Sequence, residues 1–293
     1  MVGSAIARVL KSNGYNTILA PSHAELDYID QQSVRSYLQK NKPDVIVIAA
    51  AKVGGIYANM SYPAEFLYQN LMIECNLIHE AHICGINHLL FLGSTCIYPK
   101  LSAQPIDEHA LLTGPLEPTN EAYALAKICG IKLCSFYRKQ YGHRYICAMP
   151  TNLYGPGDNY HPDNSHVIPG LIKRFHDAKV AEKKEVEMWG SGNVFREFLY
   201  VDDLADACFY LLKHYDDDLH INLGSPDEIS IKELAHLIAK TIGYKGKITH
   251  DLSKPDGTPR KKSNLTRITN LGWKPKVELQ KGLCLAYNDF LKN

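Results

Sequence analysis

The sequence predicts an α/β protein, with a doubly wound parallel sheet of the Rossmann type joined to a smaller mixed α/β substrate domain. Short apolar runs alternate with segments of helical periodicity, the pattern of strand–helix–strand units around a parallel sheet. Two of these runs, 44–50 and 87–93, are apolar almost throughout, as expected for strands buried on both faces. After Pro150 the chain becomes rich in Gly, Pro, Asn and Asp, and a long irregular segment of this kind indicates a functional region.

The expected elements follow in order along the chain. In the first half we expect strands at 16–20, 44–50, 87–93 and 144–150, with helices at 3–13, 31–41, 64–84 and 120–141. Beyond the irregular segment we expect a helix near 166–178, strands near 186–190 and 196–201, helices from Asp202 and from Ser230, and a last helix near 277–291. This order predicts a cofactor-binding domain over 1–151 that also receives about 198–223, and a substrate domain over 152–197 and 224–293.

Composition excludes several classes of protein. With 32 basic and 31 acidic side chains the chain carries no excess charge that would attract nucleic acid or an anionic membrane. Its apolar runs fall far short of the ~18 residues that indicate a membrane-spanning helix, and no secretory signal pattern is visible. Eight cysteines without a C-x-x-C pair indicate reduced thiols rather than a zinc site or a disulfide framework. We therefore expect a cytoplasmic protein that binds no metal.

Two motifs suggest carbonyl chemistry. In YALAK, Tyr123 and Lys127 stand four residues apart on a predicted helix and share one face, where the ammonium would bring the phenol's pKa closer to neutral. Ser94 follows the strand at 87–93, and ligands of open α/β sheets bind beyond the carboxyl ends of strands. Taken singly, a surface Tyr/Lys pair, a turn cap at Ser94 and a small buried hydrophobe at Cys96 remain open. Together, the motifs favour a site that donates a proton to a carbonyl oxygen.

The chain also carries longer motifs: GSTCIYP at 93–99, EPTNEAYALAK at 117–127, PTNLYGP at 150–156, HPDNSHVIP at 161–169, REFLYVDD at 196–203 and KPDGTPRK at 254–261. With them it resembles the extended short-chain dehydrogenase/reductases, and among these the branch that forms GDP-L-fucose. The resemblance runs nearly end to end. It implies an NADPH-dependent homodimer, paired through helices matching 64–84 and 120–141, that epimerises C3 and C5 of GDP-4-keto-6-deoxy-D-mannose and then reduces the C4 ketone.

The resemblance assigns roles to particular residues. Epimerisation needs a base on one face and an acid on the other, and a thiol and a histidine have ordinary pKa values of ~8.5 and ~6.5, on either side of neutrality. The family correspondence makes Cys96 the base and His166 the acid, while Tyr123 supplies the proton in the reduction beside Ser94. Lys127 would tune Tyr123 and hold the nicotinamide ribose. The implied substrate-binding residues are Thr95, Asn152, Arg174, Trp189, Arg196, Asp256 and Lys261.

The expected cofactor is NADP, and its expected contacts are Gly3, Ser22, His23, Ala51, Lys52, Gly54, Lys127, Pro150, Asn152, Leu153 and His166. Family members that prefer NADPH commonly carry an arginine where Ser22 and His23 stand, and no acidic residue stands there to reject the 2′-phosphate. A dinucleotide fold begins with a central strand and a G-x-x-G-x-x-G loop, of which only Gly3 is present here. Since an absent central strand leaves buried backbone groups unpaired, at ~1–3 kcal/mol each, we expect the native gene product to be longer.

Two other functions stay open at this point. One is a non-catalytic nucleotide-sugar-binding paralogue or fragment, although such a protein would not need Ser94, Cys96, Tyr123, Lys127 and His166 together. The other is a different nucleotide-sugar epimerase or dehydratase on the same scaffold. A dehydratase is expected to carry Asp and Glu after the serine, where Thr95 and Cys96 stand.

Overall fold

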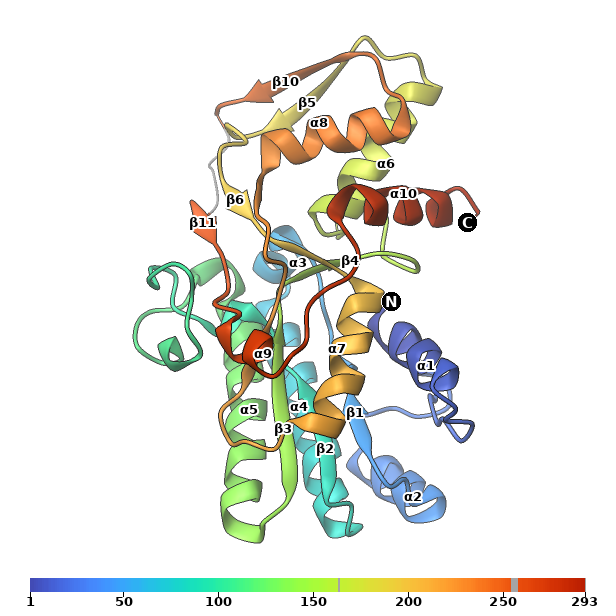
Figure 1. The fold of residues 1–293 in the computed structure, drawn as a ribbon, viewed down its shortest axis with the longest axis vertical. Helices are drawn as coiled ribbons and strands as arrows, with labels where there is room; N and C mark the ends of the chain where they lie inside the picture. The colour runs from blue at the N-terminus through green and yellow to red at the C-terminus, as the bar shows by residue number, and fades with distance from the viewer. Residues whose placement is uncertain (163, 254–257, 293) are drawn as a thin grey trace.

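The centre of the molecule is a four-stranded parallel sheet in the order β1–β2–β3–β8 (Figure 1). Its strands are β1 (Ile46–Ile48), β2 (His88–Leu92), β3 (Arg144–Pro150) and β8 (Ile221–Leu223). The computed structural model describes residues 1–162, 164–253 and 258–292. The parallel α/β sheet that the sequence predicts is thereby confirmed.

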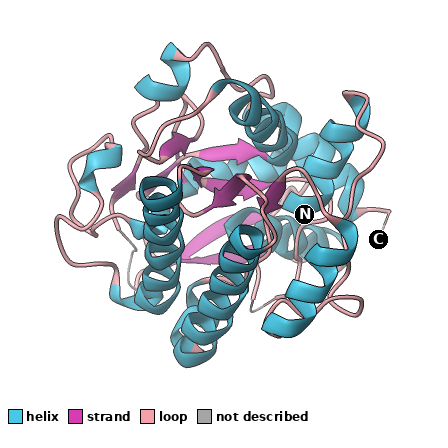
Figure 2. Ribbon diagram, turned by 90° about the horizontal axis from the view of Figure 1, so that it is seen from below, coloured by secondary structure: helices cyan, strands magenta, loops and turns pink. Residues whose placement is uncertain are grey.

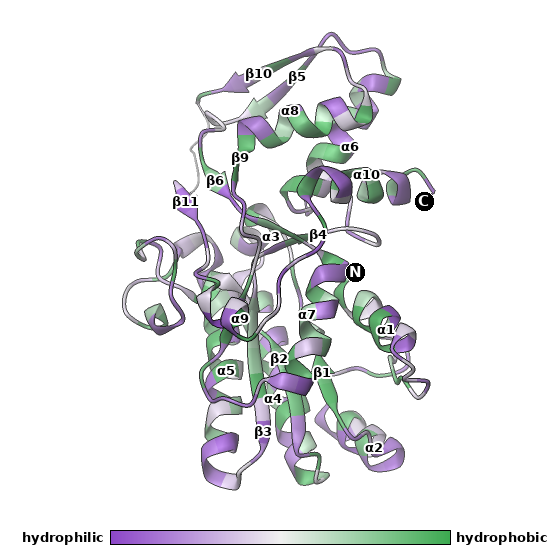
Figure 3. Ribbon diagram, in the orientation of Figure 1, coloured by the Kyte–Doolittle hydropathy of each residue, from purple (hydrophilic) through white to green (hydrophobic). Residues whose placement is uncertain are grey.

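Helices cover both faces of this sheet (Figure 2). One layer is formed by α2 (Gln31–Asn41), α4 (Pro63–Ile83) and α5 (Glu121–Tyr141), and the other by α1 (Val2–Ser12) and α7 (Val201–His214). Successive side chains of a strand point to opposite faces, so Leu89 and Phe91 join the first layer's core whereas Leu90 and Leu92 join the second. Figure 3 shows hydrophobic residues along β1 and hydrophilic ones at the far end of α5.

The remaining elements form a second group, drawn above the sheet in Figure 1. A separate apolar core lies among α6 (Val167–Val180), β5 (Glu185–Trp189), α8 (Ile231–Ile242) and α10 (Leu279–Phe290), while β10 (Lys247–Asp251) pairs with β5. Helix α8 begins at a capping box in which Ser230 and Glu233 bond each other's backbone N–H groups. The shorter elements are α3 (Ile56–Ser61), β4 (Asn152–Tyr154), β6 (Phe195–Arg196), β7 (Phe198–Tyr200), β9 (Ile229–Ser230), β11 (Arg260–Lys261) and α9 (Thr266–Asn270).

Two predicted strands differ from the structure. The strand expected at 16–20 is wrong: this stretch is mostly exposed and pairs with no strand of the described chain. A strand exists only through its ladder of hydrogen bonds, so an apolar run without a partner stays irregular. The run at 196–201 is divided at Glu197, because β6 pairs with β9 and β11 whereas β7 pairs with β4. Within the described residues, no helix combines the length and apolar character needed to cross a bilayer.

Candidate active site

The predicted catalytic motifs meet beyond the carboxyl end of β2. Ser94 caps a short 3-10 turn, η1 (Thr95–Ile97), and its Oγ accepts a hydrogen bond from the Cys96 N–H at 3.2 Å. Tyr123 and Lys127 lie on consecutive turns of α5, and Ser94 makes hydrogen bonds to both the Tyr123 phenol and the Cys96 thiol. The structure therefore brings Ser94, Cys96, Tyr123 and Lys127 into one cluster.

The pKa of the Tyr123 phenol differs from the sequence prediction. Burial raises its pKa, Cys96 and Glu74 add to this, and the hydrogen bond from Ser94 only partly offsets them. The Lys127 ammonium lies 6.0 Å from the Tyr123 ring centroid. The expectation that Lys127 brings this pKa toward neutrality is therefore wrong for the protein alone, because desolvation of the phenolate dominates. The phenol stays protonated, which is the form that a proton donor needs.

Lys127 lies beneath the cluster and is only 2% exposed. Its Nζ lies 4.6 Å from the centroid of the Phe91 ring and 3.9 Å from Oε1 of Glu74 on α4. Burial lowers the pKa of Lys127, and the Glu74 carboxylate opposes that shift. Glu74 was not among the residues predicted from the sequence, where it appears as one acidic residue within the mostly apolar run LMIECNLI.

The Cys96 thiol has an unexpected partner. Lys261, on β11, donates from Nζ to the Cys96 Sγ at 3.4 Å. Burial alone would raise the pKa of this thiol, but Lys261, Ser94 and Arg196 together bring it below its ordinary value. The sequence interpretation places Lys261 on the substrate, whereas its contact in the structure is with the candidate base. A cation beside a thiol favours the thiolate, which is the reactive form.

His166 precedes the first turn of α6 and is exposed by surface area. Enough protein surrounds its ring for desolvation to lower its pKa, so the neutral form dominates at neutral pH. The contacts identified for Cys96 are with Ser94 and Lys261, and the pairing of Cys96 with His166 stays a prediction.

The predicted substrate-binding residues lie on several elements. Arg196 donates from Nη1 to the Phe195 and Thr258 carbonyls at 2.7 Å each, and Arg174 donates to the Glu187 carbonyl at 3.1 Å. Trp189, at the end of β5, is 67% exposed. Thr95 is buried in η1, and the Asn152 amide donates to the Glu197 carbonyl at 3.1 Å. Asp256 lies outside the described residues.

The predicted cofactor contacts lie around the carboxyl ends of β1 and β3. Gly3 stands in the first turn of α1, where no side chain caps the helix and a Cβ would meet nothing within 4 Å. Ala51, Lys52 and Gly54 follow β1, while Pro150 ends β3 and Leu153 lies on β4. A helix N-terminus and glycine backbone both suit a dinucleotide pyrophosphate, so the residue types at these positions fit the expected cofactor.

Asn70, on α4, holds the loop after β1 and was not predicted from the sequence. Its Oδ1 accepts from the Lys52 N–H at 2.8 Å, and its Nδ2 donates to the Lys52 and Phe66 carbonyls at 3.0 and 2.7 Å. The Lys52 side chain forms an ion pair with Glu65. At Gly54 a Cβ would lie 2.9 Å from the Ala58 Cβ, so only glycine fits against α3 without a shift.

The turn at Ser22 and His23 has an acidic neighbour, Glu25, that the sequence interpretation did not take into account. The Glu25 carboxylate folds back and accepts hydrogen bonds from the Ser22 N–H and Oγ at 2.7 and 2.8 Å. The expectation that no acidic group lies here is therefore wrong. A carboxylate three residues along the chain occupies the Ser22 donors that the sequence interpretation assigns to a 2′-phosphate.

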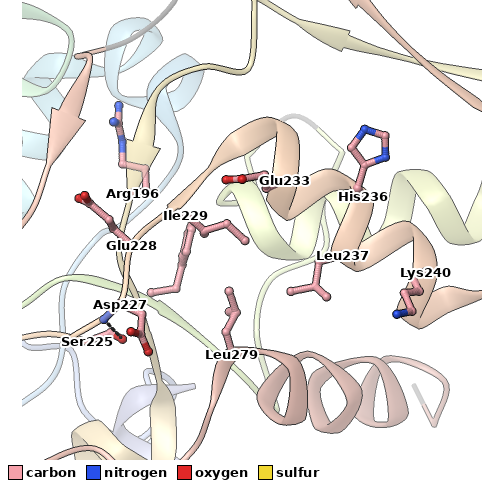
Figure 4. Close-up of a pocket in the computed structure, with 11 residues that line it drawn as sticks. Arg196, Ser225, Asp227, Glu228, Ile229, Glu233, His236, Leu237, Lys240 and Leu279 are labelled. Atoms are coloured by element: carbon pink, nitrogen blue, oxygen red, sulfur yellow. Dashed lines mark hydrogen bonds between the residues drawn. The ribbon is translucent and has the colours of Figure 1, made fainter.

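A cavity of about 600 Å³ opens between α8, α10 and β9 (Figure 4). It shares Arg196 with the predicted substrate site, but Figure 4 shows the guanidinium turned away from Leu237 and Leu279. Ser94, Cys96, Tyr123, Lys127 and His166 do not line it. In the part of the chain that the structure describes, no three His, Cys, Asp or Glu side chains are grouped to hold a metal ion.

A Ser–Tyr–Lys cluster beyond the carboxyl end of a parallel strand is typical of a nicotinamide-dependent oxidoreductase. Residues 1–224 match the model of the NAD dependent epimerase/dehydratase family, and the chain belongs to that family. It is 54% identical over 293 residues to GDP-L-fucose synthase 1 of Arabidopsis thaliana, covering 100% of this chain and 91% of the relative. To the GDP-L-fucose synthase of Escherichia coli K12 it is 51% identical over 302 residues, covering 100% and 94%.

Among solved structures, the chain superposes on a GDP-L-fucose synthetase from Naegleria fowleri bound to NADP with a TM-score of 0.92. The two are 26% identical, and the match covers 100% of this chain and 91% of that one. The resemblance inferred from the motifs is thus confirmed at the level of the family.

Proposed function

We propose that this chain is an NADP-dependent epimerase and reductase that converts GDP-4-keto-6-deoxy-D-mannose to GDP-L-fucose. The observation that carries the proposal is the Cys96 thiol, held 3.4 Å from Lys261 and bonded to the same serine as Tyr123. A simple ketone reductase needs a proton donor and a cofactor, whereas a thiolate next to that donor adds a base for removing a proton from carbon.

Epimerisation uses the protein's own groups. The Cys96 thiolate takes the proton from the carbon next to the C4 ketone, and the electron pair moves onto the ketone oxygen. Tyr123 and Ser94 hydrogen-bond that oxygen while it carries the negative charge, in a site where burial strengthens the interaction. His166, in its protonated form, returns a proton to the opposite face of the carbon. The thiol then loses its proton to solvent and His166 takes one up, after which the same steps at the second carbon complete the inversion of C3 and C5.

Reduction follows in the same place. Bound NADPH supplies a hydride to C4. Tyr123 gives its phenolic proton to the C4 oxygen, which becomes the hydroxyl of the product. Lys127, buried below Tyr123, stabilises the resulting phenolate.

We propose the same binding residues for each ligand as those inferred from the sequence. For the cofactor these are Gly3, Ser22, His23, Ala51, Lys52, Gly54, Lys127, Pro150, Asn152, Leu153 and His166. For the GDP-sugar they are Thr95, Asn152, Arg174, Trp189, Arg196, Asp256 and Lys261. We propose the division into a cofactor domain over 1–151 with about 198–223, and a substrate domain over 152–197 and 224–293. The three separate apolar cores, two at the sheet and one among α6, α8 and α10, support this division.

We also propose a cytoplasmic homodimer joined through α4 and α5. Exposed apolar side chains on these helices, among them Tyr68, Leu125 and Phe136, support such a contact. Sedimentation equilibrium tests it, with Phe136→Glu expected to shift the chain toward the monomer and Leu101→Glu, at an exposed position outside these helices, as the control. A monomeric wild-type chain would overturn the proposal.

One assay separates the two reactions. In D₂O without NADPH, the wild-type chain should place deuterium at C3 and C5 of GDP-4-keto-6-deoxy-D-mannose, read by NMR. Adding NADPH should cause loss of absorbance at 340 nm and formation of GDP-L-fucose. Cys96→Ser should slow the deuterium exchange more than it weakens NADPH binding, and Tyr123→Phe should abolish NADPH oxidation. A wild-type chain with neither activity would favour the non-catalytic binding protein, and reduction without exchange would point to another 4-keto-sugar reductase.

A further inference from the structure

Glu74 is a buried carboxylate without the bonds that such a group normally has. It is 1% exposed, and among the described residues no hydrogen bond of good geometry reaches either carboxylate oxygen, although the Gly130 backbone N–H lies close enough to lower the pKa of the group. The charged group that faces it is the Lys127 ammonium, at 3.9 Å from Oε1, which is too long for a hydrogen bond. Burying a carboxylate is costly in free energy unless an opposite charge is paired with it.

The pocket around Glu74 is shaped to keep it below Lys127. A Cβ at Gly130, on α5, would lie 2.0 Å from Glu74 Oε2 and 2.5 Å from Cζ of Phe91. The helices can therefore enclose the carboxyl group only because residue 130 has no side chain. Phe91 lies under the Lys127 ammonium at 4.6 Å, so the ring and the carboxylate together hold the amine in place.

Glu80, six residues further along α4, is a buried carboxylate whose hydrogen bonds are complete, and it serves as a comparison for Glu74. It is fully buried and accepts hydrogen bonds from Arg35 Nε and Nη2 at 2.8 and 2.9 Å and from Gln31 at 2.8 Å. These bonds use both of its oxygens and explain why it is tolerated. Glu74, on the same helix, has no such set of bonds.

We propose that Glu74 is a positioning residue for Lys127: its negative charge keeps the Lys127 amine protonated and held beneath Tyr123, in a site that would otherwise favour the neutral amine. This inference rests on the proposed function, in which Lys127 must be a cation to stabilise the Tyr123 phenolate. The residue acts through Lys127 and does not touch the substrate.

The ionisation of the pair agrees with this geometry. Burial lowers the pKa of Lys127 and Glu74 raises it. Burial raises the pKa of Glu74 to about 7, and Lys127, followed by the Gly130 backbone N–H, opposes that rise. The other titratable groups that face the pair are Tyr123, Cys75, Cys129, Cys134 and Cys147. Burial raises the pKa of Tyr123, Cys75, Cys129 and Cys134, so these four add no charge near neutral pH.

The direct test measures Lys127 in the protein without cofactor or substrate. The chain is labelled with ¹³C at the lysine ε carbon, the Lys127 resonance is identified by its loss in Lys127→Met, and its pH titration is followed by NMR. Glu74→Gln should lower the midpoint by about one pH unit or more, the effect of removing an opposite charge at this distance. Glu80→Gln, the matched control, should leave the midpoint unchanged. An unchanged midpoint in Glu74→Gln would overturn the proposal.

The kinetic test uses the reduction step. Since removal of Glu74 lowers the pH at which Lys127 loses its proton, the basic limb of kcat for NADPH oxidation should move to lower pH in Glu74→Gln, by about one unit. Glu74→Asp retains the charge and should restore most of the shift. A lower unfolding temperature with an unmoved limb would mark Glu74 as merely structural and overturn the inference.

Two controls keep the outcomes separate. Should Glu74→Gln not fold, the NMR titration of Glu74→Asp decides: its longer charge separation should lower the Lys127 midpoint by a smaller amount, and no change would contradict the proposal. If the wild-type chain shows no turnover of the GDP-sugar, the proposed function fails, while the titration of Lys127 still decides the role of Glu74.

Discussion

The contact between Lys261 and the Cys96 thiol connects a residue near the end of the chain to the candidate base after β2. Lys261 is held there by its neighbours: Glu197 accepts hydrogen bonds from the Ser263 N–H and Oγ at 3.0 and 2.5 Å, and pairs with Lys262 at 3.4 Å. Glu197 is almost fully buried, so this anchor fixes β11 against the site. The position of Lys261 is thus determined by the fold before any substrate binds.

Replacing Lys261 should therefore change the pH dependence of epimerisation. Burial already favours the neutral thiol, so Lys261→Met removes the largest opposing influence and the pKa of Cys96 should rise. The thiolate then forms only at higher pH, and the acid limb of deuterium exchange at C3 and C5 should move upward by about one unit or more. Exchange at neutral pH should fall about tenfold. Lys261→Arg, which keeps the charge, should retain the wild-type limb; a raised KM with an unmoved limb would assign Lys261 to the substrate instead.

The Glu25 carboxylate is expected to weaken the binding of NADPH. It accepts hydrogen bonds from the Ser22 N–H and Oγ, beside the place proposed for the cofactor's 2′-phosphate. Its negative charge would repel that phosphate. Glu25→Gln should tighten NADPH binding about two- to fivefold, the range for exposed charges, and leave NADH binding nearly unchanged. Fluorescence titration of both cofactors measures this, with Asp27→Asn as the neighbouring control. Equal changes for the two cofactors would place the 2′-phosphate elsewhere.

The sequence predicts an element accurately where the pattern that specifies it lies within the element itself. The helix at 31–41 and the strand at 144–150 match α2 and β3 residue for residue, because their apolar periodicity and end signals are local. The stretch at 16–20 fails because a strand depends on a partner elsewhere in the chain. The division at Glu197 could not be predicted either, since it follows from which strands β6 and β7 pair with.

The candidate site shows the same limit. Ser94, Tyr123 and Lys127 could be placed from strand end and helix spacing, whereas His166 gained its rank only from the family resemblance. Glu74, Asn70 and the contact of Lys261 with Cys96 arise from packing between distant segments. A lone acidic residue in a helix pattern does not reveal whether its partner is water, an arginine or a buried lysine.

The contact between α4 and α5 gives a prediction about an element. Gly130→Ala would place a Cβ 2.0 Å from Glu74 Oε2 and 2.5 Å from Phe91. The two helices must separate or the carboxyl group must move, so the variant should lose about 1–3 kcal/mol of unfolding free energy despite the better helix propensity of alanine. Urea denaturation measures the loss. Cys129→Ala, exposed on the same helix, should be nearly neutral, and a stabilised Gly130→Ala chain would show that the contact is looser than described.

At the scale of the whole molecule, the two groups of elements are joined by buried polar contacts as well as by the chain. Asn222, on β8, accepts from the Tyr98 hydroxyl at 2.5 Å and donates to the Ile106 carbonyl at 3.1 Å and to the Asn264 carbonyl at 3.3 Å. The segment 258–264, which returns from the upper group, is thereby fastened to the sheet.

This arrangement predicts separate footprints for the two ligands in hydrogen exchange measured by mass spectrometry. NADP⁺ should protect the start of α1 and the loop at 51–55, because both segments carry residues that we propose to contact the cofactor. GDP should protect α6, β5 and β6, which carry Arg174, Trp189 and Arg196. At 100-fold excess over Kd each ligand adds about 2.7 kcal/mol to the folded state, enough to slow exchange in the segments that it touches. Arg174→Gln should lose the GDP footprint and keep that of NADP⁺. One common footprint for both ligands would contradict the division into a cofactor domain and a substrate domain.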